Sequence, residues 1–404
     1  MFAKMQQERN VISKSTRLIK DKNLYIIFGI TLMAVMGVAS ITPAFPEIIK
    51  TFGISKKEVA YLITVFTLPG IFLAPVMGMF ADRFGRKVII IPSLFLFAIA
   101  GFACSFAESF QTLLILRFIQ GTGMSSLGML NTTMVGDLYS GNKRSTAMGY
   151  VSGVLSIGTA SYPAIGGLMA DVAWYMPFYL PLLAIPVGFA VIFGLKNPEP
   201  HKNPNLKDYL RKTWVSINKK PVWGLFLNTL LMFFILYGAY LSFFPLLLEA
   251  DFGASSSIIG ITMSAMSLTT AIVSTQVGRL KRRFTHRQLL FFSITAYFIS
   301  MVIIPLSYNW WGIVLGIVIF GCGHGLMIPN FQTMLVSYAS INERAAFMSV
   351  NAMVLRIGQT IGPVVIGICY SLGDLRTSFF GGAIIAVVMF FVLLFMIQEP
   401  PKDN

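Results

Sequence analysis

The stretch GMFADRFGRK, from Gly78 to Lys87, lies between two long apolar segments and recurs in altered form 200 residues later as GRLKRRFTHR, from Gly278 to Arg287. The same offset relates positions along most of the chain. Examples are Phe52, Gly53 and Ser55 with Phe252, Gly253 and Ser255, and Gly158, Pro163 and Gly167 with Gly358, Pro363 and Gly367. One constant offset over so many residues indicates an internal duplication. We therefore predict two similar halves in parallel orientation, joined near residue 208.

The composition places both halves in a membrane. Of the 404 residues, 55% are apolar and only 12% are charged, which is not the balance of a soluble domain. A membrane-spanning helix needs about 20 mostly apolar residues. Such runs cover 24–46, 57–80, 88–107, 110–137, 145–170, 175–195, 222–248, 255–278, 288–307, 311–337, 345–370 and 376–397. The predicted fold is all-α, with twelve transmembrane helices in two pseudo-symmetric six-helix bundles.

The net charge of +15 follows from topology. If the N-terminus is cytoplasmic, the cytoplasmic segments hold 25 of the 31 Lys and Arg, and the external segments hold four. This asymmetry matches the positive-inside bias of membrane proteins. It predicts cytoplasmic N- and C-termini in a cell inner (plasma) membrane protein, and it removes the support for a nucleic-acid partner.

Five regions follow from these segments: a cytoplasmic N-terminal segment 1–23, a bundle 24–195, a linker 196–221, a second bundle 222–397 and a cytoplasmic tail 398–404. The linker carries apolar residues at helical spacing, namely Leu206, Tyr209, Leu210, Trp214 and Ile217. This pattern favours a short helix in the membrane interface, and a plain solvated linker is the alternative. The first apolar segment is too long for a cleaved signal peptide and is expected to stay in place.

Three motifs resemble those of one family. GMFADRFGRK resembles the signature loop of the major facilitator superfamily, and Arg117 to Gly123 resembles its second motif, found in drug and proton antiporters. Gly158 to Gly167, with Tyr162, Pro163 and Gly166, is similar to the antiporter motif of the exporter branch. Tyr162 departs from the glycine usual at its position, which puts close helix packing there in doubt. The resemblance implies a twelve-helix drug:proton antiporter-like carrier that works by alternating access.

The loop itself has the chemistry of a breakable charge latch. Asp82 is an acid among cations, Asp137 offers a second carboxylate, and Gly78 and Gly85 permit tight turns. The predicted gating latch consists of Gly78, Asp82, Arg83, Gly85, Arg86, Lys87 and Asp137. The family resemblance implies that it locks the halves together in an outward-open state, with Asp82 facing the start of segment 345–370. The alternative is that these cations only enforce topology. In the second copy Arg282, preceded by Lys281, replaces the acid and Thr285 the glycine.

Ionisable residues well inside the apolar segments are few: Arg117, His324 and Arg356. A charge at such depth is costly unless it is paired or hydrated, so each is expected to face the bundle interior or a water-filled cavity. Arg117 is interpreted as part of a coupling network with Gln120 or as an interhelical anchor. His324 titrates near neutral pH when unperturbed, so it is either a proton-sensitive cavity residue or a packed helix contact. Arg356 either binds an anionic substrate group or has a structural role satisfied by carbonyls.

No carboxylate lies at mid-depth, although drug antiporters of this family commonly carry one. The candidate coupling residues are Arg117, Gln120, His324, Glu47, Glu249 and Asp171. This absence, together with two buried arginines, favours a neutral or anionic amphipath over a lipophilic cation.

Candidate cavity residues follow from helical periodicity. Phe233, Tyr237, Tyr240 and Phe244 recur as one stripe, which forms either a binding surface or ordinary packing. The other candidates are Met33, Met36, Asn131, Asn228, Met327, Asn330, Asn351, Arg356 and Gln359. Methionine-rich linings suit a wide, adaptable pocket.

No nucleotide-binding loop, zinc ligand set or catalytic triad is present in the sequence, and Cys104, Cys322 and Cys369 lie in apolar runs. We expect no enzyme activity, no metal and no cofactor, and a proton gradient as the energy source. The predicted function is proton-coupled efflux of amphipathic small molecules by a monomer among membrane lipids. The alternatives are a uniporter, symporter or exporter of an anionic metabolite or lipid-like compound, and a non-transporting sensor on the same fold.

Overall fold

The computed structural model describes residues 21–196, 217–339 and 344–399, and every regular element in these ranges is a helix. The first half contains six spans, several built from consecutive helical pieces. They are α2 (Lys22–Ala39) with η1 (Thr42–Ala44) and α3 (Phe45–Phe52); η2 (Glu58–Ala60) with α4 (Tyr61–Phe84); α5 (Arg86–Ala103) with η3 (Cys104–Phe106); α6 (Phe110–Met124) with α7 (Leu127–Leu138); α8 (Gly141–Val172); and η4 (Met176–Leu183) with α9 (Ala184–Gly194).

The second half repeats this plan. Its spans are α11 (Lys220–Phe233) with η5 (Phe234–Phe243) and α12 (Phe244–Phe252); α13 (Ser256–Leu280); α14 (His286–Leu306); α15 (Trp310–Tyr338); α16 (Arg344–Ser371); and α17 (Leu375–Met396). The duplication extends to details of the backbone. Gly53 and Gly253 end α3 and α12 in the left-handed conformation, with φ of 63° and 59°, which glycine adopts without steric cost.

The twelve predicted helices are confirmed, with ends shifted by a few residues. Eleven spans of the described chain are long and apolar enough to cross a membrane. The twelfth, α8, has 32 residues but is rich in Gly, Ser and Thr, which lowers its mean hydropathy. Small residues let membrane helices approach closely, so the composition of α8 reflects contact with neighbouring helices. The linker residues 206–216, where an interfacial helix was predicted, lie outside the described residues.

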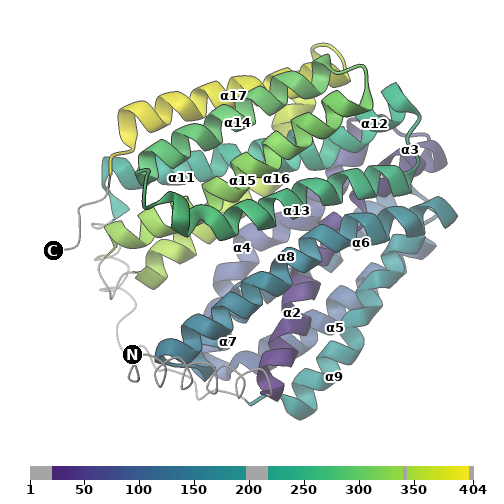
Figure 1. Ribbon diagram of the computed structural model, residues 1–404. Helices are drawn as coiled ribbons and strands as arrows, with labels where there is room; N and C mark the ends of the chain where they lie inside the picture. The colour runs from purple at the N-terminus through teal and green to yellow at the C-terminus, as the bar shows by residue number, and fades with distance from the viewer. Residues whose placement is uncertain (1–20, 197–216, 340–343, 400–404) are drawn as a thin grey trace, which may run out of the picture.

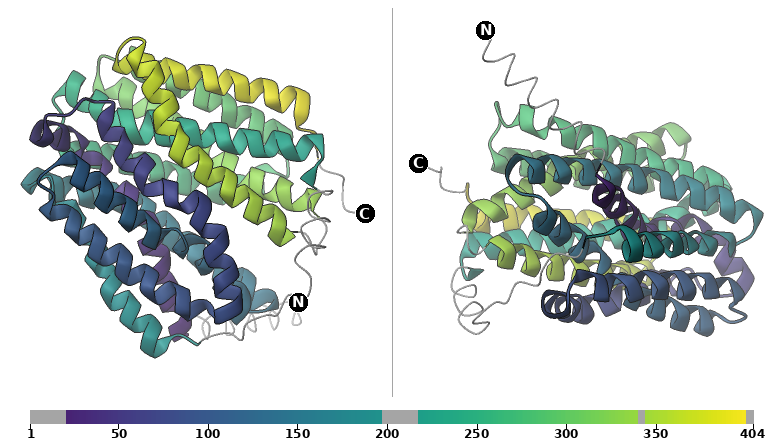
Figure 2. Two further views of the ribbon diagram at one scale, coloured as in Figure 1. Left: turned by 180° about the vertical axis from the view of Figure 1, so that it is seen from behind. Right: turned by 90° about the horizontal axis from the view of Figure 1, so that it is seen from below.

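The two bundles lie side by side, converging at one end and separating at the other (Figure 1, and left panel of Figure 2). At the wide end lie the helix ends that carry Arg86, Lys87, Lys220 and Arg287, and we call this end the basic face. At the narrow end lie α3 and α12, and we call it the opposite face.

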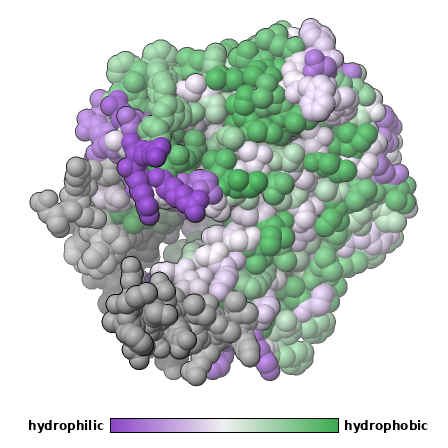
Figure 3. All heavy atoms as spheres, in the orientation of Figure 1, coloured by the Kyte–Doolittle hydropathy of each residue, from purple (hydrophilic) through white to green (hydrophobic). Residues whose placement is uncertain are grey.

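The surroundings of glycines on α8 and α13 show that the two halves diverge toward the basic face. A Cβ added to Gly167 or Gly260 would collide with backbone of the other half, at Ser256 and Pro163. Nearer the basic face, a Cβ on Gly149, Gly153 or Gly278 would meet no atom within 4 Å. The space-filling view shows a recess between the bundles at this end, next to hydrophilic side chains (Figure 3). The structure is therefore closed at the opposite face and open at the basic face.

Candidate functional site

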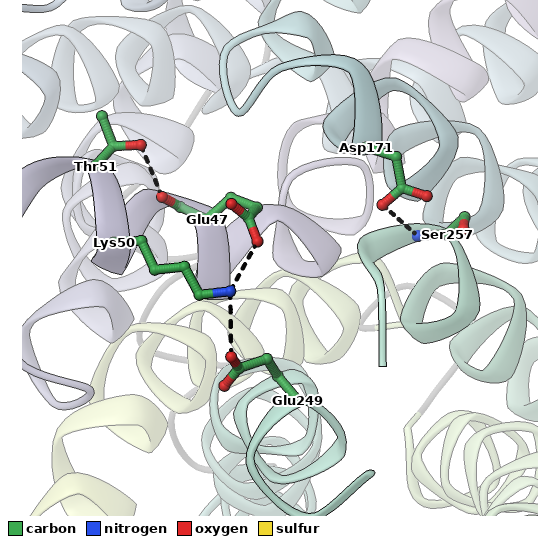
Figure 4. A network of polar contacts seen from close by, with 6 residues as sticks. All are labelled: Glu47, Lys50, Thr51, Asp171, Glu249 and Ser257. Atoms are coloured by element: carbon green, nitrogen blue, oxygen red, sulfur yellow. Dashed lines mark hydrogen bonds and ion pairs between the residues drawn. The ribbon is translucent and has the colours of Figure 1, made fainter. Parts of the chain in front are cut away.

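An ion pair and a helix-end contact close the opposite face (Figure 4). Nζ of Lys50 on α3 lies 3.1 Å from Oε1 of Glu47 and 3.2 Å from Oε1 of Glu249 on α12. The backbone N–H of Ser257, in the first turn of α13, donates to Oδ1 of Asp171 on α8 at 3.2 Å. Three candidate coupling acids, Glu47, Glu249 and Asp171, are thus gathered at the closed end. Each of the two contacts joins one half to the other.

Next to these contacts, small residues of the antiporter motif bring the backbone of α8 close to the backbones of the first span and of α13. A Cβ on Gly166 would collide with the carbonyl of Ser40, so α8 touches the first span directly. The backbone N–H of Ala164, after Pro163, donates to Oγ of Ser264 on α13 at 3.2 Å. Tyr162 is buried beside Gly158, within the same helix. The close backbone contacts of this motif are made at Gly166 and Gly167, one turn after Tyr162.

The residues of the predicted latch come together at the basic face of the first half. Nη1 of Arg86 lies 2.5 Å from Oδ1 of Asp82, and its Nε lies 3.0 Å from Oδ2 of Asp137. Gly85 has φ of 96°, which a side chain would strain, and so makes the turn between α4 and α5. Lys87 donates to the carbonyl of Ile192 at 2.9 Å, tying α5 to α9.

The remaining latch residues lie beside this cluster. The guanidinium of Arg83 lies over the Phe84 ring at 5.5 Å, and Gly78 faces the Met129 side chain. The expected partner of Asp82 lies at the start of α16, where residues 340–343 are outside the described chain. The gating role of the latch therefore stays a prediction.

The second copy of the loop is built on a different chemistry. The ammonium of Lys281 contacts Nε2 of His286, whose Nδ1 lies 2.8 Å from Oδ1 of Asn330 on α15. Asn330 was assigned to the cavity, but its side chain is buried here between α14 and α15. His286 was not predicted as part of this cluster, although the duplication offered a signal, since His286 occupies the position of Arg86.

Arg117 is fully buried and held by backbone oxygens. Its Nη2 donates to the carbonyl of Gly37 at 2.8 Å, its Nε to that of Leu62 at 3.4 Å, and its Nη1 to Oε1 of Gln120 at 2.6 Å. Its guanidinium also lies 4.0 Å from the centre of the Phe66 ring, a cation–π distance. Arg117 therefore ties α6 to α2 and α4, which favours the anchor interpretation.

His324 also has an internal partner. Its Nδ1 is hydrogen-bonded to the hydroxyl of Tyr297 on α14, and its ring stacks on Phe320 at 6.4 Å. His324 is buried, with 7% of its surface exposed. This arrangement favours a packed contact within the second half. Tyr297 was not singled out in the sequence, because nothing in its segment distinguishes it from other aromatic residues.

Arg356, by contrast, lies between the halves. A Cβ on Gly70 of α4 would approach its Cδ to 3.3 Å, and a Cβ on Gly128 of α7 would approach its Nη2 to 3.6 Å. Nη1 of Arg356 donates to Oε1 of Gln359 at 3.0 Å, and Nε2 of Gln359 donates to the Tyr237 hydroxyl at 2.9 Å. Three candidate cavity residues thus form one chain of contacts at the interface.

Threonines that the sequence did not single out join the halves beside Arg356. Oγ1 of Thr64 donates to the carbonyl of Thr360 at 3.1 Å, and the hydroxyl oxygens of Thr360 and Thr67 lie at a hydrogen-bonding distance of 2.9 Å. A lone threonine in an apolar segment gives no sign of its neighbour, so only the fold could reveal this pair.

The expected aromatic stripe is divided by η5, a π-helical run. In a π-helix each residue turns the chain through a smaller angle than in an α-helix, so residues three apart, such as Tyr237 and Tyr240, no longer share one face. Tyr237 turns to Gln359 on α16, whereas Tyr240 donates to the carbonyl of Met263 on α13 at 3.0 Å. The prediction of one continuous stripe is wrong for this reason. Phe233 stacks near Tyr237, and Phe244 near Tyr240.

The other cavity candidates are buried in this conformation. Asn131 donates to Oγ1 of Thr31 at 2.7 Å, linking α7 to α2. Several buried polar atoms lack a partner among the described residues: Nε2 of Gln120, Oδ1 of Asn131, both amide atoms of Asn228 and Oδ1 of Asn351. The methionines Met33, Met36 and Met327 are buried as well. Of the cavity candidates, Arg356, Gln359 and Tyr237 thus form a polar group at the junction of the halves, beside the threonine contacts.

This fold and these contacts accompany a match to one family. The family model of the Major Facilitator Superfamily matches residues 27–250 and 231–404, and the chain belongs to this superfamily. Among solved structures, a bacterial homologue of the human lysosomal transporter Spinster in an inward-facing, occupied conformation is similar with a TM-score of 0.76 and 18% identity. That likeness covers 92% of this chain and 95% of the other. The nucleoside transporter NupG gives a TM-score of 0.73 at 16% identity, covering 93% of this chain and 98% of its own.

Curated relatives are similar over most of the chain. Multidrug resistance protein 1 of Bacillus subtilis is 25% identical, covering 89% of this chain and 92% of its own. Quinolone resistance protein NorA of Staphylococcus aureus is 22% identical, covering 86% and 89%. The bacillibactin exporter of Bacillus subtilis is 23% identical, covering 95% and 98%. The protein is a membrane transporter of this superfamily, and these relatives are named for drug resistance and for export.

Proposed function

We propose that this chain exports amphipathic small molecules from the cytoplasm in exchange for protons, by alternating access. The observation that carries the proposal is the recess between the halves, which is closed at the opposite face by a small number of individual contacts. An ion pair, a helix-end hydrogen bond and glycine contacts can each break without unfolding either bundle. The names of the relatives, two for drug resistance and one for export, support the direction of transport.

The orientation is part of the proposal. We assign the basic face to the cytoplasm, together with both termini, and the excess of Lys and Arg in the segments predicted to be cytoplasmic supports this assignment. The conformation described above would then receive substrate from the cytoplasm.

Proton coupling is assigned to the carboxylates of the opposite face. Glu249 faces Lys50 and, through it, Glu47, whereas Asp171 faces the N-terminus of α13. Protonation of Glu249 or Asp171 from outside removes the negative charge that holds each contact. The outer gate is then weakened when external protons bind, which links proton entry to outward opening. His324 is less suited, because Tyr297 occupies its Nδ1 within one half.

A uniporter, a symporter or another type of exporter for an anionic metabolite or lipid-like compound is the second candidate, favoured by Arg356 at the interface. Purified protein in proteoliposomes tests both, with neutral, anionic and cationic fluorescent amphipaths and with or without an imposed pH gradient. The proposal expects movement against the concentration gradient only when protons flow in the opposite direction. Transport that ignores the pH gradient would support uniport. No movement of any probe would leave a sensor as the function.

A further inference from the structure

Arg356 is a charged side chain of one half that reaches the other. Arg356 belongs to α16, and its backbone carbonyl accepts a hydrogen bond from Oγ1 of Thr360 at 2.9 Å. Thr360 in turn contacts Thr67 on α4, so the inter-half contact fixes the helix just beside the arginine. The guanidinium then extends past Gly70 toward Gly128, two residues without side chains.

The donors of Arg356 are mostly unused. A guanidinium carries five N–H donors, and the described chain gives Arg356 one side-chain acceptor, Oε1 of Gln359. None of the ion pairs between described residues includes Arg356. Its atoms are also absent from the fully buried polar atoms that lack a partner, so the free donors are not sealed in packing. Arg117 also has a glutamine three residues later, Gln120, but two backbone carbonyls and the Phe66 ring surround its guanidinium.

The surroundings provide both space and apolar surface. Arg356 is partly exposed, and its side chain passes Gly70 and Gly128, where no Cβ narrows the space; a Cβ would approach it to 3.3 Å at Gly70 and to an ordinary contact of 3.6 Å at Gly128. Met353, one turn before Arg356 on α16, is 44% exposed. Gln359 and Tyr237 hold the guanidinium from the other side through two consecutive hydrogen bonds. An amphipath can thus place a charged end on Arg356 and an apolar part on neighbouring side chains.

We propose that Arg356 is an anion subsite that binds the carboxylate of an amphipathic substrate. A planar guanidinium pairs with a carboxylate through two parallel hydrogen bonds, and such a pair would satisfy a charge that is otherwise costly at this depth. Gln359 and Tyr237 are positioning residues that fix the orientation of the guanidinium. The inference rests on the proposed function, since it names the substrate class of the same recess.

The test is a binding measurement on the full chain in nanodiscs of phosphatidylcholine. The probes are a dansyl-labelled medium-chain carboxylic acid and the primary amide of the same molecule, which differ in charge and hardly in shape. The wild type is expected to bind the acid about tenfold or more tightly than the amide. Arg356→Gln should lower the affinity for the acid to that for the amide and leave the amide unchanged.

Three further variants make the result specific. Arg356→Lys keeps the charge but not the planar fork, so it should retain part of the preference. Gln359→Glu places a carboxylate beside Arg356 and should abolish the preference while the arginine is still present. Lys56→Gln, which removes one positive charge from the opposite face, should match the wild type. Thermal unfolding of each variant confirms that the fold is intact.

Equal affinity of the wild type for acid and amide would overturn the inference, as would an equal loss of both in Arg356→Gln. Nanodiscs containing phosphatidic acid separate a lipid headgroup from a soluble substrate. Displacement of the acid by phosphatidic acid in the wild type, but not in Arg356→Lys, would assign the subsite to lipid and also overturn it. Proton-driven export of the neutral amide in proteoliposomes tests the proposed function independently, so the two failures are distinguishable.

Discussion

Lys50 on α3 and Glu249 on α12 join the two halves across the opposite face, with Nζ and Oε1 3.2 Å apart. Both side chains are partly exposed, at 57% and 30%. Exposed ion pairs contribute less than about 1 kcal/mol each, so this pair biases the gate without locking it.

We expect Glu249→Gln to shift the population toward separated opposite faces while changing the free energy of unfolding by less than about 1 kcal/mol. The measurement is the spin-label distance between Lys56→Cys and Ile258→Cys in a variant without the three native cysteines. Asp251→Asn is the matched control, since Asp251 pairs with Arg376 inside the second half. Identical distances in both variants would contradict the assignment.

Gly167→Ala tests the glycine contacts on α8. The added methyl group meets the backbone of Ser256, which has no flexible end to move aside. We expect a cost of about 1–3 kcal/mol to this conformation and a longer spin-label distance at the opposite face. Gly153→Ala, on the same helix but facing open space, should leave both unchanged. A methyl group tolerated equally at the two positions would show that the close contact does not hold the gate.

Replacing Arg117 or Arg356 by methionine compares what each arginine contributes to stability and to transport. Arg117→Met leaves the side-chain oxygen of Gln120 without its donor and breaks two contacts between helices, so we expect a loss of about 2–4 kcal/mol. Arg356→Met removes a charge with one side-chain acceptor and should be neutral or stabilising. Denaturation in detergent measures both, and transport per folded molecule should keep its proton-to-substrate ratio in Arg117→Met. A changed ratio would return Arg117 to the coupling residues.

Tyr297→Phe removes the hydroxyl bonded to His324 and leaves the imidazole Nδ1 without a partner in the described chain. We expect a loss of about 1 kcal/mol in stability and no shift in the pH dependence of transport, because His324 faces its own half. His324→Gln should behave in the same way. A displaced pH profile in either variant would instead make His324 a proton-coupling residue.

The sequence determined the architecture because that depends on quantities additive along the chain. Apolar length gave the twelve spans, the constant offset gave the two halves, and the pairing of Gly53 with Gly253 was visible before the turn was seen. Even α8, with its lower hydropathy, was predicted from its apolar run at 145–170. The motif GMFADRFGRK located the charge cluster, since neighbours in a tight loop are neighbours in space.

Only the tertiary structure decided what each embedded polar residue does. Arg117 and Arg356 each lie inside an apolar segment with a glutamine three positions later. Nevertheless, Arg117 is fully buried among carbonyls, whereas Arg356 is partly exposed between the halves. Tyr237 and Tyr240 share a stripe on an ideal helix and face different neighbours on η5. Whether a buried charge is satisfied depends on atoms supplied by other helices. Local sequence spacing carries no information about those atoms, and helix packing alone brings them into place.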